Sequence, residues 1–588
     1  MCGIAGIIGD YKESQLDEML SSQHHRGPDA TAKYFDTGFA ALGHNRLAII
    51  DLSAKSNQPF IDDSGRYVLV FNGEIYNYIE IKEALQDQYD FKTESDTEVL
   101  LAAFIIYGKS CLEKLNGMFA FSIWDNQEKK LFAARDRFGV KPFYYSLFHN
   151  TFYFSSEIKA LHAAGITKKP SEKVWASYFA YGSYGNPKET FWSDIVELPG
   201  GHFLEYDGKN LFLKKWYYFE EEVAKQPKNI TFEQAKEQYV GLLKDSIKLR
   251  FRADVPVGFN ISGGLDSSVL LALVNLQEND KNQKSVIGNL QSAINAYTFY
   301  TNNSDYDELP WVEKMIAKTN NPLVKVLLQA DEIPTLIRKM QWQQDEPFGG
   351  IPTLAYAKIF EHARKDKVLV LLDGQGMDEQ WAGYDYYTQN NEATIQGVQD
   401  SPYKTKMLSD TFFAKAEKPL YPKPFKDEVL NKQYRDLFYT KIPRALRFND
   451  RISMAFSTEL REPFLDYRLV EFAFSLPLDF KIKEGISKFI LREIASEYLA
   501  DNLVFAPKRP LQTPQREWLA TDLKEWVAQC FAELENSVYS NWFDKDSLEN
   551  ELKSYFEGNI QSSFHLWQCI SLYEIAINNK FAQAKTNN

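Results

Sequence analysis

Residues 255–276 read VPVGFNISGGLDSSVLLALVNL. The apolar run before Ser262 predicts a buried strand and the run after Ser268 predicts a helix, so SGGLDSS (262–268) is the turn between them. Backbone N–H groups of such a turn and the helix N-terminus point at one place, and glycines let a ligand approach closely. This geometry holds phosphate oxygens. Because no lysine follows, the turn is not the GxxxxGK[ST] loop, and Asp266 suits a magnesium ion better than a phosphate.

A second acidic glycine turn follows another apolar strand. VLVLL (368–372) runs into DGQGMDE (373–379). Strands that alternate with helices predict a parallel sheet, and turns at the carboxyl ends of parallel strands share the edge where ligands bind. We therefore expect Asp378 to join Asp266 on a magnesium ion that bridges ATP phosphates. The alternative for this stretch is a surface turn without a ligand.

The chain starts MCGIAGIIGD, with a cysteine directly after the methionine. Cys2 is small enough for the initiator methionine to be removed, which would leave a thiol and a free α-amine on one residue. An α-amine has a pKa of about 7.7–8.0 and can accept the thiol proton. Such a residue is an activated nucleophile for an amide carbonyl. The alternative is a chance cysteine in a first strand.

Composition and charge narrow the class of protein. The 588 residues carry a net charge of −13, which argues against nucleic acid as a partner. We expect no membrane span and no secretory signal, because no apolar run is long enough and the start lacks a basic region. The four cysteines show neither disulfide nor metal-ligand spacing. These features predict a cytoplasmic protein.

The pattern changes along the chain. Residues 1–205 show short alternating strands with some helices, which predicts an α+β domain of stacked antiparallel sheets. Residues 206–230 are expected to be a linker. Residues 231–588 alternate strands with helices and then become mostly helical, which predicts an α/β domain with a parallel sheet and helical additions.

The second half carries motifs that resemble a known family. These are SGGLDSS, DEPFGGIPT (345–353), LLDGQGMDEQWAGY (371–384), NDRISMAFSTELREPFLDYRLVEF (449–472) and SKFILRE (487–493). They resemble the pyrophosphate-loop ATPases, and more narrowly the synthetase half of the glutamine-dependent asparagine synthetases. The resemblance implies that Lys488 neutralises charge on the ATP α-phosphate and that Phe299 packs near the adenine. It also implies that ATP is bound by Ile261, Ser262, Gly263, Gly264, Asp266, Ser267, Phe299, Asp373 and Gly374.

The first half resembles the N-terminal-nucleophile (Ntn) glutamine amidotransferases, whose fold has four αββα layers. The resemblance is carried by Cys2 with RGPDA (26–30), HNRLAIID (44–51), NGEIYN (72–77) and SDTEVL (95–100). It implies that Arg46 holds the glutamine α-carboxylate, for which a planar guanidinium is suited. Asp96, assisted by Glu74, would hold the α-amine. The Asn72 side chain and the Gly73 N–H would form the oxyanion hole.

Together the two resemblances imply a glutamine-hydrolysing asparagine synthetase. Glutamine would release ammonia at Cys2, aspartate and MgATP would form β-aspartyl-AMP, and ammonia would convert it to asparagine. Family members are often homodimers, so a homodimer is possible. Three departures, Asp373, Gln375 and Glu462, leave open an alternative in which another carboxylic acid is the acceptor, since Gln375 replaces an acidic residue that orients the activated acid. A non-catalytic binding protein is a third hypothesis, which the retention of Cys2 and Asp266 disfavours.

Overall fold

The N-terminal half is built from two six-stranded antiparallel sheets. The computed structural model describes residues 2–279, 294–389, 401–506 and 512–586. The first sheet has the order β10 (Val196–Glu197), β8 (Tyr144–Phe148), β9 (Thr151–Ser155), β1 (Gly3–Ile8), β3 (Ala40–Arg46) and β2 (Ala30–Asp36). The second has the order β12 (Leu211–Lys215), β11 (His202–Tyr206), β7 (Lys130–Arg135), β6 (Gly117–Asp125), β5 (Tyr67–Ile75) and β4 (Phe60–Ile61).

Side chains that alternate between the two faces of each strand explain how the sheets and helices of this half stack in layers. In β5, Val68 and Val70 pack in the core between the two sheets, whereas Leu69 and Phe71 pack in a separate core under helices. This is the two-residue period of a strand that is buried on both faces. Helices α1 (Glu13–Ser22) and α5 (Ile158–Ala163) contact the first sheet, and α3 (Asp96–Tyr107) contacts the second and packs against α2 (Tyr78–Leu85). The half is therefore the expected four-layer αββα fold.

The C-terminal half contains one parallel sheet of five strands. Its order is β15 (Leu323–Leu327), β14 (Ala296–Tyr300), β13 (Val257–Asn260), β16 (Val370–Leu372) and β17 (Glu459–Arg461). All four neighbouring pairs are parallel. One face packs in a core with α8 (Phe232–Arg250), α9 (Leu265–Asn279), α10 (Leu309–Thr319) and α17 (Tyr467–Ser475). The other packs with α11 (Ile333–Gln344) and α12 (Ile351–Lys365). This confirms the predicted α/β domain.

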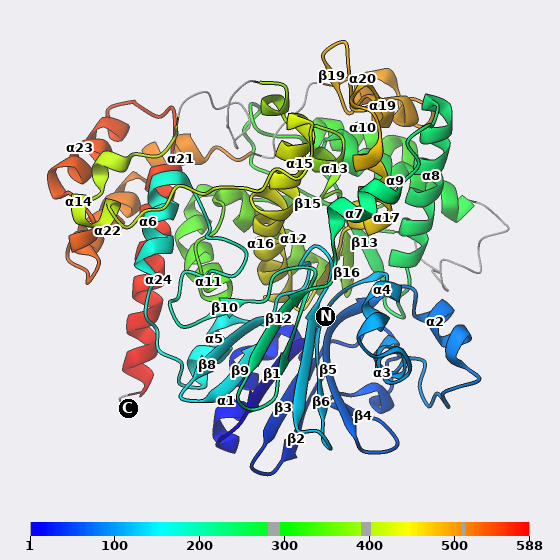
Figure 1. Ribbon diagram of the computed structural model, residues 1–588. Coiled ribbons are helices and arrows are strands. Elements are labelled where there is room, and N and C mark those ends of the chain that lie inside the picture. Colours follow the sequence, from blue (N-terminus) through cyan, green and yellow to red (C-terminus); the bar gives the residue numbers. More distant parts are fainter. Residues whose placement is uncertain (1, 280–293, 390–400, 507–511, 587–588) are drawn as a thin grey trace.

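Helices make up most of the remaining chain, as expected. Figure 1 shows the N-terminal half (blue to cyan) below the green-to-red C-terminal half, with the long helix α24 running beside α6. The elements not yet named are α4 (Cys111–Lys114), α6 (Glu172–Tyr181), α7 (Phe219–Lys225), α13 (Met377–Gln380), α14 (Asp410–Phe413), α15 (Glu428–Phe438), α16 (Lys441–Met454), α18 (Leu478–Lys481), β18 (Ile482–Lys483), β19 (Ile486–Ser487), α19 (Phe489–Ala495), α20 (Asp501–Val504), α21 (Gln515–Ala520), α22 (Lys524–Glu535), α23 (Lys545–Phe556) and α24 (Phe564–Thr586). Within the described residues, no helix has the length and apolar character needed to cross a bilayer.

The segment 206–230 holds regular structure where the sequence suggested a linker. It contains the strand β12 and the helix α7, and β12 pairs with β11 along its whole length. The second sheet therefore extends to Lys215. The strand is hard to recognise because it lies at the sheet edge, where its side chains are only partly buried and lysines are common.

Two buried ion pairs join the halves at η1 (His24–Arg26) and α16. Arg26 Nη1 lies 2.9 Å from Glu157 of its own half and 2.9 Å from Asp450 on α16. Arg451, also on α16, lies 3.3 Å from Glu157 and donates a 2.8 Å hydrogen bond to the Ser156 carbonyl. We call Arg26, Glu157, Asp450 and Arg451 the junction cluster. All four side chains are buried, so each half contributes one arginine and one carboxylate to a network that water does not reach.

Candidate active sites

Strands β1 and β5 come together at Cys2. The Cys2 backbone nitrogen donates to Asn72 Oδ1 at 3.0 Å, and Sγ lies 3.9 Å from the Leu47 carbonyl oxygen. Arg26 Nε donates to the Cys2 carbonyl at 3.0 Å, which ties the nucleophile candidate to the junction cluster. Burial raises the pKa of the Cys2 thiol, and the positive charge of Arg46 opposes this shift. The thiol therefore needs a base to become a nucleophile.

Asn72 and Gly73 lie in the C-terminal half of β5. Asn72 is fully buried, and its Nδ2 donor has no hydrogen-bond partner among the described residues. Gly73 has φ +153°, and a Cβ there would lie 2.1 Å from the Met118 carbonyl oxygen. Only glycine fits this close approach to β6. The pair therefore offers an open amide donor beside Cys2, which is what a developing oxyanion needs.

Arg46, Glu74 and Asp96 surround the same place. Arg46 Nη1 donates to the Ser53 carbonyl at 2.7 Å and to Asn57 Oδ1 at 2.8 Å, so the loop after β3 fixes its guanidinium. The charges of Arg46 and Glu74 both act on the pKa of Cys2, and that of Asp96 acts on the pKa of Glu74. The structure thus brings together all the residues expected to hold glutamine.

The two carboxylates of this group are held differently. Asp96 starts α3, and its Oδ2 accepts the Ile75 N–H at 2.9 Å. Burial raises the pKa of Asp96 to about 6. Glu74 lies 3.4 Å from Arg461, the last residue of β17 in the other half. Burial also raises the pKa of Glu74 well above its usual range. A bound cation such as a substrate ammonium would favour the charged form of both groups.

The turn 262–268 lines a cavity of about 190 Å³ in the C-terminal half. Ser267 Oγ donates to the Ser262 carbonyl at 2.9 Å, which closes the turn, and the Gly264 N–H donates to Ser262 Oγ at 3.3 Å. The Gly263 N–H donates to Glu308 at 3.1 Å. Helix α9 starts at Leu265, so its N-terminus also faces this cavity.

The second glycine turn lines the same cavity, as predicted. A Cβ on Gly374 would lie 3.1 Å from the Ser267 nitrogen, so the two turns abut. Asp373 accepts the Gly374 N–H at 2.6 Å and the Asn260 side chain at 3.2 Å, and burial raises its pKa to about 6. Gln375 lines the cavity as well. The parallel sheet therefore gathers both turns at one edge.

Lys488 joins the two turns. Its Nζ lies 2.7 and 2.6 Å from the carboxylate oxygens of Asp266 and 2.7 Å from Asp378 Oδ1. Burial alone would lower the pKa of Lys488, but the two carboxylates outweigh it and raise the pKa. The residue has a left-handed backbone (φ +57°) directly before α19, and its N–H donates to the Trp381 carbonyl at 3.1 Å. A fixed ammonium group thus lies beside the turn 262–268.

The donor set at this place fits a magnesium ion. Mg²⁺ is usually held by one or two carboxylates together with substrate phosphates and water. Asp266 and Asp378 share one cation here and line one cavity with the turn 262–268. Within the described residues, no group of three or more acidic, histidine or cysteine side chains could hold a metal by itself.

Ile261 and Phe299 lie beside the cavity rather than in it. They line a small adjoining pocket that shares Ser262 with the main one. The Phe299 ring stands 6.4 Å from the Tyr356 ring. Two further residues were not singled out from the sequence. Gly383, within the motif 371–384, leaves no room for a Cβ because one would lie 1.9 Å from Asp378 Oδ1. Arg461, within the motif 449–472, reaches Glu74.

Comparison with known proteins identifies the family that each half of the chain matches. Residues 1–217 match the family of glutamine amidotransferase domains, and residues 238–578 match the asparagine synthase family. The chain is 29% identical to asparagine synthetase [glutamine-hydrolyzing] 3 of Bacillus subtilis (94% of both chains) and 26% identical to number 1 of that organism (96% of this chain, 95% of the relative). It is 35% identical to a putative asparagine synthetase [glutamine-hydrolyzing] 2 of Methanocaldococcus jannaschii (65% of this chain, 76% of the relative). The chain therefore belongs to the asparagine synthase family.

Proposed function

We propose that the protein converts aspartate to asparagine, with glutamine as the source of ammonia and ATP as the source of energy. One observation carries the proposal. A single chain holds a cysteine beside a buried amide donor without a partner among the described residues and, at a second site, a lysine fixed beside a glycine turn at a helix N-terminus. The first arrangement suits amide hydrolysis, and the second suits attack of a carboxylate on the ATP α-phosphorus.

In the first reaction, the Cys2 thiol attacks the side-chain amide carbonyl of glutamine. After removal of Met1, the α-amine of Cys2 accepts the thiol proton, and Asn72 Nδ2 with the Gly73 N–H stabilises the oxyanion. The C–N bond breaks, ammonia leaves with a proton returned from the amine, and a thioester remains on Sγ. Water hydrolyses the thioester and releases glutamate. Arg46 holds the substrate carboxylate, and Asp96 with Glu74 holds its ammonium group.

In the second reaction, a carboxylate oxygen of aspartate attacks the ATP α-phosphorus and pyrophosphate leaves. The N–H groups of the turn 262–268 and the hydroxyls of Ser262 and Ser267 hold the phosphates, Lys488 neutralises charge that develops on the α-phosphate, and Phe299 packs near the adenine. Asp373 and Gly374 line the part of the cavity that holds the nucleotide. Ammonia that travels through the protein then attacks the acyl carbon, AMP leaves, and Gln375 helps orient the intermediate.

We further propose that Mg²⁺ is bound with ATP by Asp266 and Asp378. The ion would supply charge neutralisation on the phosphate oxygens. Asp266 and Asp378, which contact the Lys488 ammonium in this structure, would hold the ion, and Lys488 would then be available to the α-phosphate. The four cysteines are unpaired and buried, which supports a reducing cytoplasmic environment.

A product assay tests the proposal. Purified protein is incubated with MgATP, glutamine and aspartate, and asparagine, glutamate and AMP are followed by mass spectrometry. Equal yields of asparagine and AMP are expected. Cys2→Ala should abolish the use of glutamine but spare synthesis from ammonium, whereas the control Cys111→Ala, at a buried cysteine on α4, should keep both. Glutamate without asparagine would show that aspartate is not the acceptor.

A further inference from the structure

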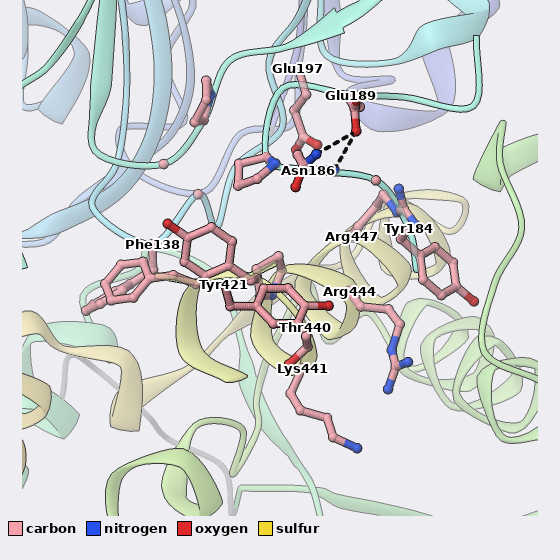
Figure 2. A pocket seen from close by; sticks show the side chains of 18 of the residues that line it. Phe138, Tyr184, Asn186, Glu189, Glu197, Tyr421, Thr440, Lys441, Arg444 and Arg447 are labelled. Atoms are coloured by element: carbon pink, nitrogen blue, oxygen red, sulfur yellow. Dashed lines mark hydrogen bonds between the residues drawn. The ribbon is translucent and has the colours of Figure 1, made fainter. Parts of the chain in front are cut away.

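A cavity of about 290 Å³ lies between the two halves (Figure 2). Its N-terminal wall comes from the ends of β7 and β12 and from residues 181–202, and its C-terminal wall comes from residues 403–447. Both walls lie in the described part of the chain. None of the residues that the proposed reactions use lines it.

The C-terminal wall is positively charged. Lys441, Arg444 and Arg447 follow one another at spacings of three in α16, which places them on the same side of the helix. The helix starts at Lys441, so the positive end of its dipole adds to the positive potential. Figure 2 shows Thr440, Lys441 and Arg444 together on this wall.

Two arginines of this wall have unused hydrogen-bond donors. For Arg444 the described residues provide neither a hydrogen bond nor an ion pair, and its guanidinium stands 5.7 Å from the Tyr184 ring centre. Arg447 is paired with Glu346 through Nη1 at 2.9 Å and is only 9% exposed. Its Nε and Nη2 are buried without a partner among the described residues. Buried guanidinium donors are costly to leave unpaired, so this wall is suited to an anion.

The opposite wall offers acceptors, and rings lie between the two. Figure 2 shows Asn186, Glu189 and Glu197 across the cavity from Arg444. Glu197 is paired with Arg135 at 2.6 Å, and Glu189 accepts hydrogen bonds from Asn186, which fixes both carboxylates. Seven tyrosines line the cavity. Their ring faces can stack on a flat ring of a ligand.

We infer that this cavity binds a small organic anion built on a flat ring, with the anionic group on Arg444 and Arg447 and ring N–H or O–H donors directed at Glu189 and Glu197. A nucleoside monophosphate has this chemistry, and so does an aminoaryl carboxylate. The site is separate from the ATP cavity, which is lined by other residues and contains Lys488. It would make the protein responsive to a ligand that binds outside both active sites.

Isothermal titration calorimetry tests this with two probes, GMP for the phosphate class and 4-aminobenzoate for the carboxylate class. Each is titrated into the full-length protein in the presence of saturating ATP. We expect one of them to bind, and Arg444→Gln to weaken its binding about tenfold or more, since a hydrogen bond to a charged group is lost. Because Arg444 has no structural partner among the described residues, the variant should keep its fold and its glutaminase activity.

Two controls locate the bound probe. Lys318→Gln removes an exposed charge in the last turn of α10, and Lys488→Met alters the ATP cavity; both should leave probe binding unchanged. Arg444→Lys keeps the positive charge but loses the planar guanidinium with its paired N–H donors, so this variant should bind the probe with intermediate affinity. The inference is wrong if neither probe binds, if Arg444→Gln binds as tightly as the parent, or if Lys488→Met abolishes binding.

Discussion

Replacing Lys488 by methionine keeps the length of the side chain and removes its ammonium group. Three contacts of 2.6–2.7 Å to Asp266 and Asp378 are then lost. Breaking a buried ion pair costs about 3–5 kcal/mol. The two carboxylates are about one-fifth exposed (20% and 19%), so water partly compensates and we expect the lower end, about 3 kcal/mol.

Magnesium should rescue this loss without nucleotide. In the variant, the two carboxylates repel each other and have no ammonium competitor, so a divalent cation can bind them. At a concentration of about 100 times its dissociation constant, an ion that binds only the folded state stabilises it by about 2.7 kcal/mol. In the parent protein, the Lys488 ammonium already contacts these carboxylate oxygens. Mg²⁺ alone should therefore stabilise the parent protein much less than the variant. Formation of AMP should fall by about a hundredfold or more in the variant, because charge on the α-phosphate is no longer neutralised.

The assay is urea unfolding with and without MgCl₂, together with AMP formation in the presence of all substrates. Lys483→Met is the matched control, because Lys483 is an exposed lysine in the neighbouring strand β18. It should unfold like the parent and keep activity. Two results would refute the idea that Mg²⁺ and the Lys488 ammonium compete for Asp266 and Asp378. One is a Lys488→Met variant as stable as the parent protein, and the other is an equal shift of the unfolding midpoint by Mg²⁺ in the variant and in the parent.

Three further predictions concern other residues. The pKa of Asp96 is raised to about 6, so the glutaminase kcat/KM should fall as the pH drops through 6 and the carboxylate loses its charge, and Asp96→Asn should be weak at every pH. Arg26→Lys cannot contact Glu157, Asp450 and the Cys2 carbonyl together, so urea unfolding should show a loss of a few kcal/mol and glutamine hydrolysis should slow. Burial raises the pKa of Glu462 to about 8, so the folded state binds its proton more tightly than the unfolded chain. This one group should lower stability by about 1.4 kcal/mol per pH unit between about 4.5 and 8, and Glu462→Gln should make the slope of stability against pH shallower by that amount in urea unfolding measured at pH 5 to 9.

Local patterns predicted most of the fold. The strand that ends in NGEI is β5. Its side chains alternate between the core that separates the two sheets and the core under the helices, as expected for a strand buried on both faces. The turn 262–268 lies between β13 and α9 as expected, because a buried apolar strand, two glycines and a helical pattern leave few alternatives. β12 was missed because edge strands carry polar side chains.

The candidate sites were harder to predict than the elements that carry them. The turn 262–268 predicted a role for Asp266 and the resemblance one for Lys488, but their contact joins residues 222 positions apart, and no local pattern encodes such a pairing. The reach of Arg461 to Glu74 and the cavity between the halves arise where the two halves pack against each other. Neither carries a motif, so only the three-dimensional arrangement reveals them.

The junction cluster has a consequence for how such a chain can be recombined. Arg26 and Glu157 come from one half, Asp450 and Arg451 from the other, and the charges cross over between them. Consider a chimera that takes its first half from one relative and its second half from another. Its junction cluster can form the two ion pairs between the halves only when both relatives carry the same charges at these four positions. A mismatched pair would bury like charges against each other beside Cys2. The two halves are therefore expected to be exchanged as a matched set rather than as independent modules.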